Sequence, residues 1–109
     1  MTDCIFCKII KKEIPARILY EDSDMIVFPD IHPAKPVHLL IVLKQHISDL
    51  LELTDESLWS KVRLVIGKMV REQKLEGKGF RVGINGGGAQ AIDHLHVHLM
   101  GPISKTASM

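Results

Sequence analysis

Hydrophobic and polar residues follow two different periods along this chain, and the changes of period mark the expected elements. Near the start, apolar residues recur at helical spacing over residues 5–10 (Ile-Phe-Cys-Lys-Ile-Ile), which predicts a short amphipathic helix. Ile14-Pro15 is expected to end this helix, because the residue before a proline avoids the α region. The apolar side of such a helix can cover a sheet.

Short β-rich runs predict five strands, at residues 17–21, 25–29, 38–43, 80–85 and 94–100. The first two runs are separated by Asp22-Ser23-Asp24, which predicts a hairpin. The third run, His-Leu-Leu-Ile-Val-Leu, is the most apolar part of the chain and is expected to be a central strand.

A long amphipathic helix is predicted between the third and fourth strands. Thr54 is the expected N-cap, and acidic residues in 55–57 complement the helix dipole. Glu76-Gly77-Lys78-Gly79 is expected to stop the helix. Its apolar face comprises Leu58, Val62, Val65, Ile66, Met69 and Val70.

Five strands with one long and one short helix indicate an α+β fold with a mainly antiparallel sheet. We expect the helices to cover one face of this sheet and to leave the other face partly open. The sequence contains no repeat or linker, so residues 1–109 are predicted to form one domain with a loose tail at 104–109.

Charge and hydropathy exclude two classes of partner. The chain has 14 basic and 13 acidic residues and a formal net charge of +1, so no electrostatic footprint for nucleic acid is present. Any phosphate must therefore be recognised by a few side chains or backbone groups at one site and not by a large basic surface. The N-terminus lacks the features of a signal peptide and no apolar run reaches membrane-spanning length, so a cytoplasmic protein without a membrane partner is expected.

Three histidines alternate with aliphatic residues in the last predicted strand, at His94, His96 and His98. Side chains on a strand alternate between faces, so these imidazoles are expected to project together while residues 95, 97 and 99 face the core. This row favours a functional site, and a metal-binding strand without catalysis is the alternative.

The glycine-rich segment at residues 85–90 (Asn-Gly-Gly-Gly-Ala-Gln) lies between the last two predicted strands. Glycine allows backbone amides to approach a phosphate closely, although a glycine run can also be no more than a flexible turn. Its position ahead of the histidine row favours the phosphate site.

Cys4 and Cys7 have the spacing of a zinc knuckle, and His46 with His94 would complete a tetrahedral Cys2His2 set. A redox pair and two unremarkable small residues are the alternatives. A redox motif of this type should follow a strand and open a long helix, whereas this pair begins the chain. We therefore favour a structural zinc, which makes His94 a structural residue.

The pattern His-x-His-x-His followed by two apolar residues resembles the signature of the histidine triad (HIT) superfamily. Segments 4–10, 13–15, 20–22, 28–33 and 44–47 look like the Hint branch of that superfamily, in order and at similar spacing. The third triad position is His98 rather than glutamine, which argues against the nucleotidyltransferase branch. Some members of the family carry a structural zinc.

The resemblance implies that His96 is a nucleophile that attacks the α-phosphate of a nucleotide. A neutral imidazole, with a reference pKa of ~6.5, is a good nucleophile when its other nitrogen is held protonated. His38 and His98 are then expected to donate hydrogen bonds to the phosphate oxygens. No catalytic metal is required for this step.

The resemblance also implies a purine nucleotide site. Asp30 is expected to accept hydrogen bonds from the ribose, although it could instead only cap a turn. The base is expected to lie between Ile5, Phe6, Ile9, Phe28 and Ile31, each of which taken alone could be ordinary core. The glycine-rich segment would contribute Asn85, Ala89, Gln90 and Ala91.

Ala91 occupies the place where many family members have a serine that hydrogen-bonds the phosphate or the leaving group. Loss of that hydroxyl removes on the order of 0.5–1.5 kcal/mol of hydrogen bonding. The predicted function is a nucleoside phosphoramidate hydrolase. A dinucleoside polyphosphate hydrolase and a nucleotide-binding or scaffold protein with weak catalysis are the alternatives.

Relatives of this branch form homodimers with a continuous ten-stranded sheet, and the resemblance implies the same here. Trp59, Val62 and Val70 extend the apolar face of the long helix beyond a narrow stripe, which suits burial on two sides. A generous core face within one chain accounts for the same pattern.

Overall fold

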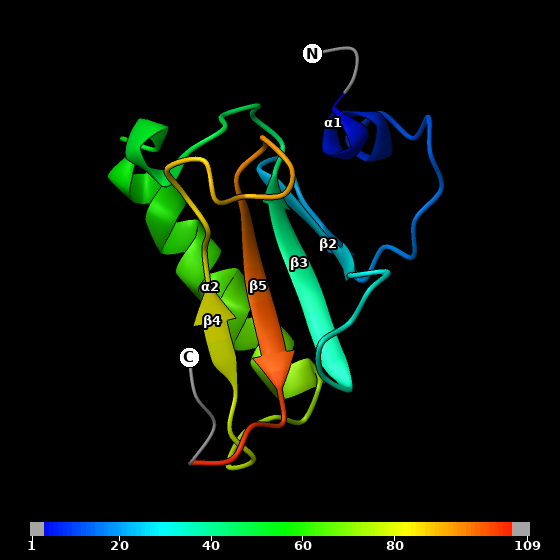
Figure 1. Cartoon of the computed structure of the whole chain (residues 1–109), viewed down its shortest axis with the longest axis vertical. Coiled ribbons are helices and arrows are strands. Elements are labelled where there is room, and N and C mark those ends of the chain that lie inside the picture. Colours follow the sequence, from blue (N-terminus) through cyan, green and yellow to red (C-terminus); the bar gives the residue numbers. More distant parts are fainter. Residues whose placement is uncertain (1–3, 106–109) are drawn as a thin grey trace.

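Five antiparallel strands form one sheet in the order β1-β2-β3-β5-β4 (Figure 1). The computed structural model describes residues 4–105. Its strands are β1 (Tyr20–Glu21), β2 (Met25–Pro29), β3 (Val37–Leu43), β4 (Arg81–Gly83) and β5 (His96–Gly101). Its helices are α1 (Ile5–Ile10), the 3-10 helix η1 (Leu50–Glu52) and α2 (Glu56–Glu72). The predicted α+β class and the antiparallel sheet are confirmed.

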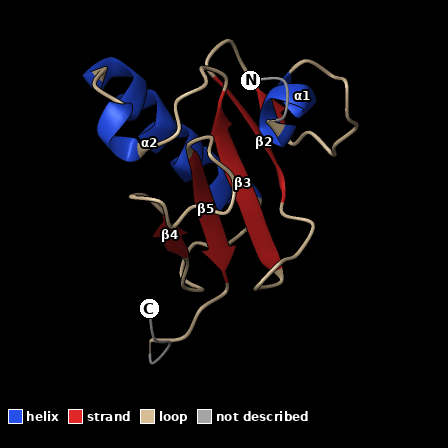
Figure 2. Ribbon diagram, turned by 45° about the horizontal axis from the view of Figure 1, so that its top comes forward, coloured by secondary structure: helices blue, strands red, loops and turns tan. Residues whose placement is uncertain are grey.

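The two α-helices lie on opposite faces of the sheet, which corrects the expectation that both cover one face. Alternate residues of β2 and β3, such as Val27 and Ile41, pack with α2 in the larger core. The intervening residues, such as Phe28 and Leu40, pack with Phe6 of α1 in a smaller cluster. Figure 2 shows α2 behind β3 and β5, with α1 on the other side. Because α1 has only 6 residues, it covers only part of its face.

Helix α1 has the predicted residues, 5–10, and α2 ends before the stop expected at residues 76–79. A lysine adopts the left-handed conformation after each helix. Lys12 has a φ of 65°, and Glu13 N–H donates to the Lys8 carbonyl oxygen at 2.8 Å. Lys74 has a φ of 59°, and Leu75 N–H donates to the Val70 carbonyl oxygen at 3.0 Å. These contacts close the last turns before the proline and glycine signals are reached.

Further boundaries differ from the sequence prediction. The N-cap of α2 is Asp55 rather than Thr54, because its carboxylate accepts the backbone N–H groups of Ser57 and Leu58. The first strand is shortened to β1 and the fourth to β4.

The fifth strand begins at His96 rather than His94. Leu95 N–H donates to the Ile47 carbonyl oxygen at 2.7 Å, outside the sheet, so the chain bends into β5 just before its first residue.

Two other expectations concern the ends of the chain and the membrane. Ser104 and Lys105 are described, but the rest of the predicted tail, residues 106–109, lies outside the described residues, as do residues 1–3. Among the described residues, no helix has the length and apolar character needed to cross a membrane.

Candidate active site

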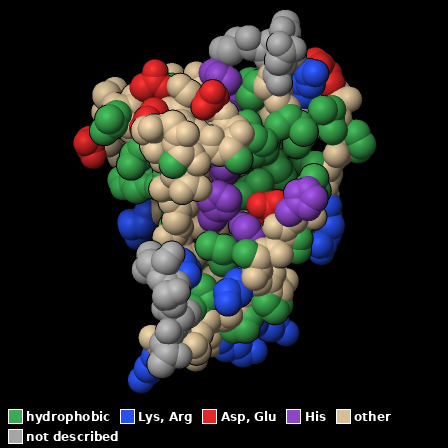
Figure 3. All heavy atoms as spheres, in the orientation of Figure 1, with side chains coloured by type: hydrophobic (Ala, Val, Ile, Leu, Met, Phe, Trp, Pro, Cys, Tyr) green, Lys and Arg blue, Asp and Glu red, His purple; other side chains and the backbone are tan. Residues whose placement is uncertain are grey.

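A cavity of about 800 Å³ opens between α1 and the sheet. Figure 3 shows it as a hollow lined by hydrophobic side chains, with histidine and acidic side chains along its lower border. The wall on the α1 side consists of Ile5, Phe6 and Ile9, and the sheet supplies Phe28, Leu40, His96 and His98. The remaining lining residues are Ile14, Pro15, Ala16, Arg17, Pro29, Asp30, Ile31, His32, Asn85, Ala89, Ala91 and Ile92.

The cavity brings together nearly all the residues proposed from the sequence for nucleotide binding. Those that line it are Ile5, Phe6, Ile9, Phe28, Asp30, Ile31, Asn85, Ala89, Ala91, His96 and His98. Gln90 does not line it. The Gln90 side chain instead fastens the loop, donating to the Ser48 carbonyl oxygen at 2.6 Å and accepting Gly88 N–H at 3.0 Å.

Sequence reasoning missed the loop at residues 14–17 and the side chains of His32, Leu40 and Ile92. Pro15 and its neighbours line the cavity, a role that the helix-stop signal at Ile14-Pro15 does not indicate. Leu40 could have been found from strand register, because it lies opposite His98 in the β3·β5 pair.

His96 is held with one ring nitrogen satisfied and the other available. Its Nδ1 lies 2.8 Å from the His94 carbonyl oxygen, which can only accept, so Nδ1 carries the proton in the neutral ring. The edge of the ring packs against Phe6, with ring centroids 5.0 Å apart. His96 is only 6% exposed, yet it lines the cavity. Its Nε2 therefore has a lone pair and no protein partner among the described residues.

His38 and His98 form a hydrogen-bonded pair beside His96. Ala34 N–H donates to Nδ1 of His38 at 2.9 Å, so the proton of neutral His38 is on Nε2. That Nε2 lies 2.9 Å from Nδ1 of His98, which leaves the Nε2–H of His98 as a donor. Burial, and then the charges of His96 and His38, lower the pKa of His98 below its usual 6.5. His38 itself does not line the cavity.

Asp30, His38 and His98 have donor atoms within 4.8 Å of one another, the spacing of a metal site. The hydrogen bonds argue against a cation at this place. A metal on Nε2 of His38 would displace its proton to Nδ1, which already faces the N–H of Ala34. The three residues therefore fit a hydrogen-bonded chain better than a metal site.

Asp30 caps a turn and lines the cavity at the same time. One carboxylate oxygen accepts His32 N–H at 2.9 Å, and the other lies 3.4 Å from Nε2 of His38. The turn cap weighed from the sequence is therefore present, and it fixes the carboxylate at the wall of the cavity.

The glycine-rich segment is shaped by a residue that the sequence did not indicate, Asp49. Its carboxylate accepts Gly87 N–H at 2.8 Å and Leu51 N–H at 3.1 Å. Hydrogen bonds from Gly87, and then from Leu51, lower the pKa of Asp49. Gly87 and Gly88 have φ values of 64° and 93°, which other residues rarely adopt. Asp49 therefore holds the loop that supplies Asn85 and Ala89 to the cavity.

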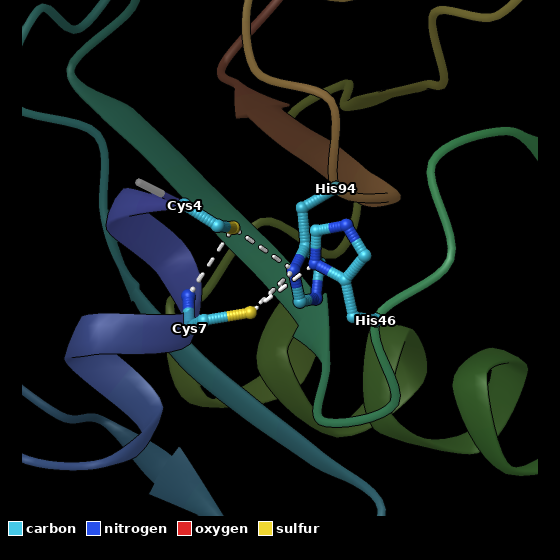
Figure 4. A group of neighbouring side chains, drawn as sticks. All are labelled: Cys4, Cys7, His46 and His94. Atoms are coloured by element: carbon cyan, nitrogen blue, oxygen red, sulfur yellow. Dashed lines mark hydrogen bonds between the residues drawn. The ribbon is translucent and has the colours of Figure 1, made fainter. Parts of the chain in front are cut away.

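The cysteines and two further histidines gather beside α1 (Figure 4). We call Cys4, Cys7, His46 and His94 the Cys2His2 cluster. The Sγ of Cys4 lies 3.3 Å from Nδ1 of His94, and the Sγ of Cys7 lies 3.2 Å from Nδ1 of His46. The four donor atoms lie within 4.8 Å of one another, as the sequence spacing predicted.

The Cys2His2 cluster fits zinc in the distances between its sulfur and nitrogen atoms and in the protonation of its His94 ring. Zinc with bonds of ~2.3 Å to sulfur and ~2.0–2.1 Å to nitrogen places sulfur and nitrogen ligands about 3.5 Å apart. Nε2 of His94 lies 2.6 Å from the Leu43 carbonyl oxygen and must carry the proton. The lone pair on Nδ1 therefore faces the sulfur atoms, and the Leu43 carbonyl is the outer partner that metal-binding histidines usually have. Burial also lowers the pKa of His94, which keeps the ring neutral.

The arrangement can therefore support phosphoryl chemistry without a metal in the cavity. A free imidazole nitrogen on His96 can attack phosphorus, and the N–H of His98 can donate to a phosphate oxygen nearby. Apolar side chains offer a surface for a base, and Asp30 offers an acceptor.

Comparison with known proteins extends over almost the whole chain. A family model described as scavenger mRNA decapping enzyme C-term binding matches residues 3–109. Protein HitA of Neisseria gonorrhoeae is 44% identical over 93% of this chain and 97% of its own length. A 14 kDa zinc-binding protein of Brassica juncea is 39% identical over 91% of this chain and 92% of its own. A HIT family hydrolase from Clostridium thermocellum superimposes with a TM-score of 0.92 at 35% identity, covering 100% of this chain and 98% of that one.

Proposed function

The chain belongs to the histidine triad (HIT) superfamily, and from this premise we propose that it is a nucleotide-binding hydrolase that cleaves purine nucleoside phosphoramidates. The observation that carries the proposal is the state of His96. Its ring lines the cavity, and the His94 carbonyl oxygen, 2.8 Å from Nδ1, leaves Nε2 free. A neutral imidazole held in this way is a nucleophile near pH 7.

In the first step, the lone pair on Nε2 of His96 attacks the α-phosphorus, and the bond from phosphorus to the leaving nitrogen breaks. The leaving nitrogen takes a proton from water and departs as the amine, while the nucleotidyl group remains on His96. The Nε2–H of His98 donates a hydrogen bond to a phosphate oxygen, where negative charge is redistributed in the transition state.

In the second step, water attacks the same phosphorus, and the bond to His96 breaks. The nucleoside monophosphate leaves with the oxygen of that water, and the proton released replaces the one taken by the amine. His38 was expected to contact the phosphate directly. We assign it instead to holding Nδ1 of His98 at 2.9 Å, so that the other nitrogen of His98 remains the donor.

The apolar part of the cavity is proposed to hold the base. Phe6 and Ile9 of α1 face Phe28 of β2 in one cluster, and Ile31, 84% exposed, lies at the cavity wall beside Asp30. An exposed isoleucine at a cavity wall indicates a surface for an apolar ligand, and a flat purine that packs on it would remove the side chain from water. The Asp30 carboxylate is proposed to accept the ribose hydroxyls.

A nucleotide-binding protein with weak catalysis is the second candidate, and Ala91 is the observation that favours it. Ala91 lines the cavity and provides no hydroxyl where many relatives have a serine. A missing donor that acts only in the transition state lowers the rate without weakening binding of the nucleotide.

The Cys2His2 cluster is proposed to hold one structural zinc ion. The ion would join α1 to the segment that follows β3, through His46, and to the segment that precedes β5, through His94. It takes no part in the steps above. The free cysteines suit a reducing compartment, so we propose the cytoplasm as its location. Metal analysis of protein never exposed to chelator should give about one zinc per chain, and its absence would remove this part of the proposal.

A homodimer is proposed from the surface of α2 and β4. Val62 and Val70, used from the sequence as an argument for it, are 1% and 6% exposed and belong to the core of one chain. Trp59, the third residue of that argument, is 39% exposed, and Leu64, Phe80 and Val82 are also exposed, at 59%, 47% and 37%. Burying these against a second copy would extend the sheet past β4.

The test of the proposed function is incubation with an adenosine phosphoramidate and, separately, with a diadenosine polyphosphate. Mass spectrometry of a brief pulse, quenched without acid, should find a nucleotidyl adduct on His96. Release of adenosine monophosphate from the phosphoramidate supports the proposal, and faster cleavage of the polyphosphate favours that alternative. Binding without any turnover favours the second candidate.

His96→Ala is the matched variant for that experiment. It should abolish turnover and the adduct while nucleotide affinity, measured by calorimetry, changes by only a small factor, because the base and ribose contacts remain. A fully active His96→Ala protein would refute the covalent mechanism.

A further inference from the structure

Helix α1 takes part in both the Cys2His2 cluster and the cavity. Cys4 is its N-cap and Cys7 lies in its first turn. Between and after them, Phe6 and Ile9 are 4% and 7% exposed, pack on β2 and β3, and line the cavity. One short helix therefore carries two metal ligands and one wall of the proposed base site.

At 6 residues this helix is too short to be stable alone, so its position depends on what it packs against. Its apolar side chains and those of the loop that follows, Ile14, Ala16 and Ile18, pack against the smaller cluster. The ion pair from Lys12 to Glu21, 2.6 Å long, is exposed and contributes little. The cysteines therefore supply the second set of contacts that position α1, and it is the set at the N-terminal end of the helix.

The other two members of the cluster belong to the sheet. His46 follows β3, and His94 lies just before β5. The His94 ring is anchored by its own hydrogen bond, Nε2 to the Leu43 carbonyl oxygen at 2.6 Å. A metal ion bound by all four residues would therefore fasten the N-terminal end of α1 to the sheet.

We propose that metal binding at the Cys2His2 cluster sets the affinity of the cavity for nucleotide, by holding α1 as the wall against which the base packs. This inference rests on the proposed nucleotide site. Because the coupling between two binding sites is reciprocal, bound nucleotide must tighten metal binding by the same factor. Couplings of this kind are typically about 5-fold to 150-fold.

The effect falls on binding and not on the chemical step. His96 takes its orientation from the His94 carbonyl oxygen at 2.8 Å, and His94 keeps its bond to Leu43 whether or not its Nδ1 binds metal. Removing the metal should therefore raise Kd and KM while kcat changes little. A general loss of folded protein would do the opposite, lowering the apparent kcat at constant KM.

Two measurements test the inference. In reducing buffer, adenosine monophosphate is titrated by calorimetry into zinc-loaded protein and into protein stripped by chelator, with circular dichroism to confirm folding. The zinc affinity is then measured by competition with a chromophoric chelator, with and without saturating adenosine monophosphate. The expected result is a nucleotide affinity at least about 5-fold weaker without zinc, the same factor in the zinc affinity, and full recovery on adding zinc.

Variants keep the test decisive if the stripped protein unfolds. Cys7→Ala should raise KM with kcat largely retained, and added zinc should not rescue it. Lys8→Ala, on the same helix turn but outside the cluster, should behave as the parent protein. Equal nucleotide affinity with and without zinc, or a chain that binds no zinc, overturns the inference. Zinc-loaded protein that binds no nucleotide overturns the proposed function as well.

Discussion

At the scale of single residues, His98 links the chemistry of the site to pH. Burial, followed by the charges of His96 and His38, lowers its pKa below 6.5, so it stays neutral in mildly acidic solution. A neutral His98 accepts from His38 and can donate toward the cavity, so it should keep both roles until pH falls through its lowered pKa. The ring signals of His98, followed by NMR as a function of pH, measure this.

The lowered pKa of His98 also makes the free energy of unfolding depend on pH. Between the lowered pKa and 6.5, the folded chain binds fewer protons at His98 than the unfolded chain does. The free energy of unfolding should therefore be unaffected by this group above pH 6.5 and should fall as pH decreases through that window. A His98 ring that titrates at or above pH 6.5 in the folded protein would contradict this prediction.

Ala91 offers a gain-of-function prediction. Ala91→Ser adds a hydroxyl at the cavity wall, where it can donate to the phosphate or the leaving group. At about 0.5–1.5 kcal/mol for one hydrogen bond, kcat/KM should rise roughly 2-fold to 10-fold. Steady-state kinetics on the phosphoramidate measure the change. Ala91→Gly, which alters bulk without adding a donor, should show no gain, and an equal gain in both variants would exclude the hydroxyl as its cause.

The position of a site residue was predictable from the sequence where it depends only on which face of one strand the side chain occupies. The alternation at 94–99 predicted that His94, His96 and His98 project together, and His96 and His98 do line the cavity. His94 precedes the strand and lies in the Cys2His2 cluster instead, as the spacing and types of the four ligands predicted. Hydrogen-bond assignments were not predictable, because they depend on loop positions. The carbonyl that holds His96 and the N–H of Ala34 that fixes His38 both come from segments outside regular strands.

At the scale of elements, the glycine-rich loop depends on Asp49. Asp49→Ala removes the acceptor for Gly87 N–H and for Leu51 N–H, so the loop that carries Asn85 and Ala89 should loosen. We expect KM to rise several-fold with a smaller change in kcat, measured by steady-state kinetics. Asp49→Asn keeps an acceptor oxygen for only one of the two N–H groups, which bond to different carboxylate oxygens, so its KM should lie between those of the parent and of Asp49→Ala.

Asp55→Ala is the control for that prediction. Asp55 also caps a helix, accepting Ser57 N–H at 2.9 Å, but it does not contact the loop. Its loss should lower Tm and leave KM unchanged. If both aspartate variants raise KM alike, the effect comes from general destabilisation and not from the loop.

Element identity was predictable and element ends were not. The spacing of apolar residues identified β2, β3, β5 and both α-helices, because each of them buries one or two faces. The edge strands β1 and β4 have no buried residue, and short β-rich runs next to turns identified them instead. The ends were set by contacts that a period does not encode, such as the left-handed Lys12 and Lys74. Helix η1 has no buried residue and owes its turn to the Asp49 and Glu52 capping box, so no hydrophobic signal marks it.

At the scale of the whole molecule, exposed apolar surface on α2 and β4 predicts self-association. Val82→Asp places a charge on the outer strand of the sheet, where a second copy would pair. We expect the parent chain to sediment as a dimer at micromolar concentration and the variant as a monomer. Lys11→Glu, at the end of α1 on the opposite face of the sheet, should remain dimeric. A parent chain that sediments as a monomer contradicts the dimer.

Strand β5 places Leu99 in the main core and His98 in the cavity, one residue apart. A slip of pairing by a single position would exchange the two faces, sending imidazoles into hydrocarbon and leucines toward the substrate. A chain that is misregistered at β5 should therefore be both destabilised and without the proposed activity, so specific activity should fall in proportion to the fraction of misregistered molecules.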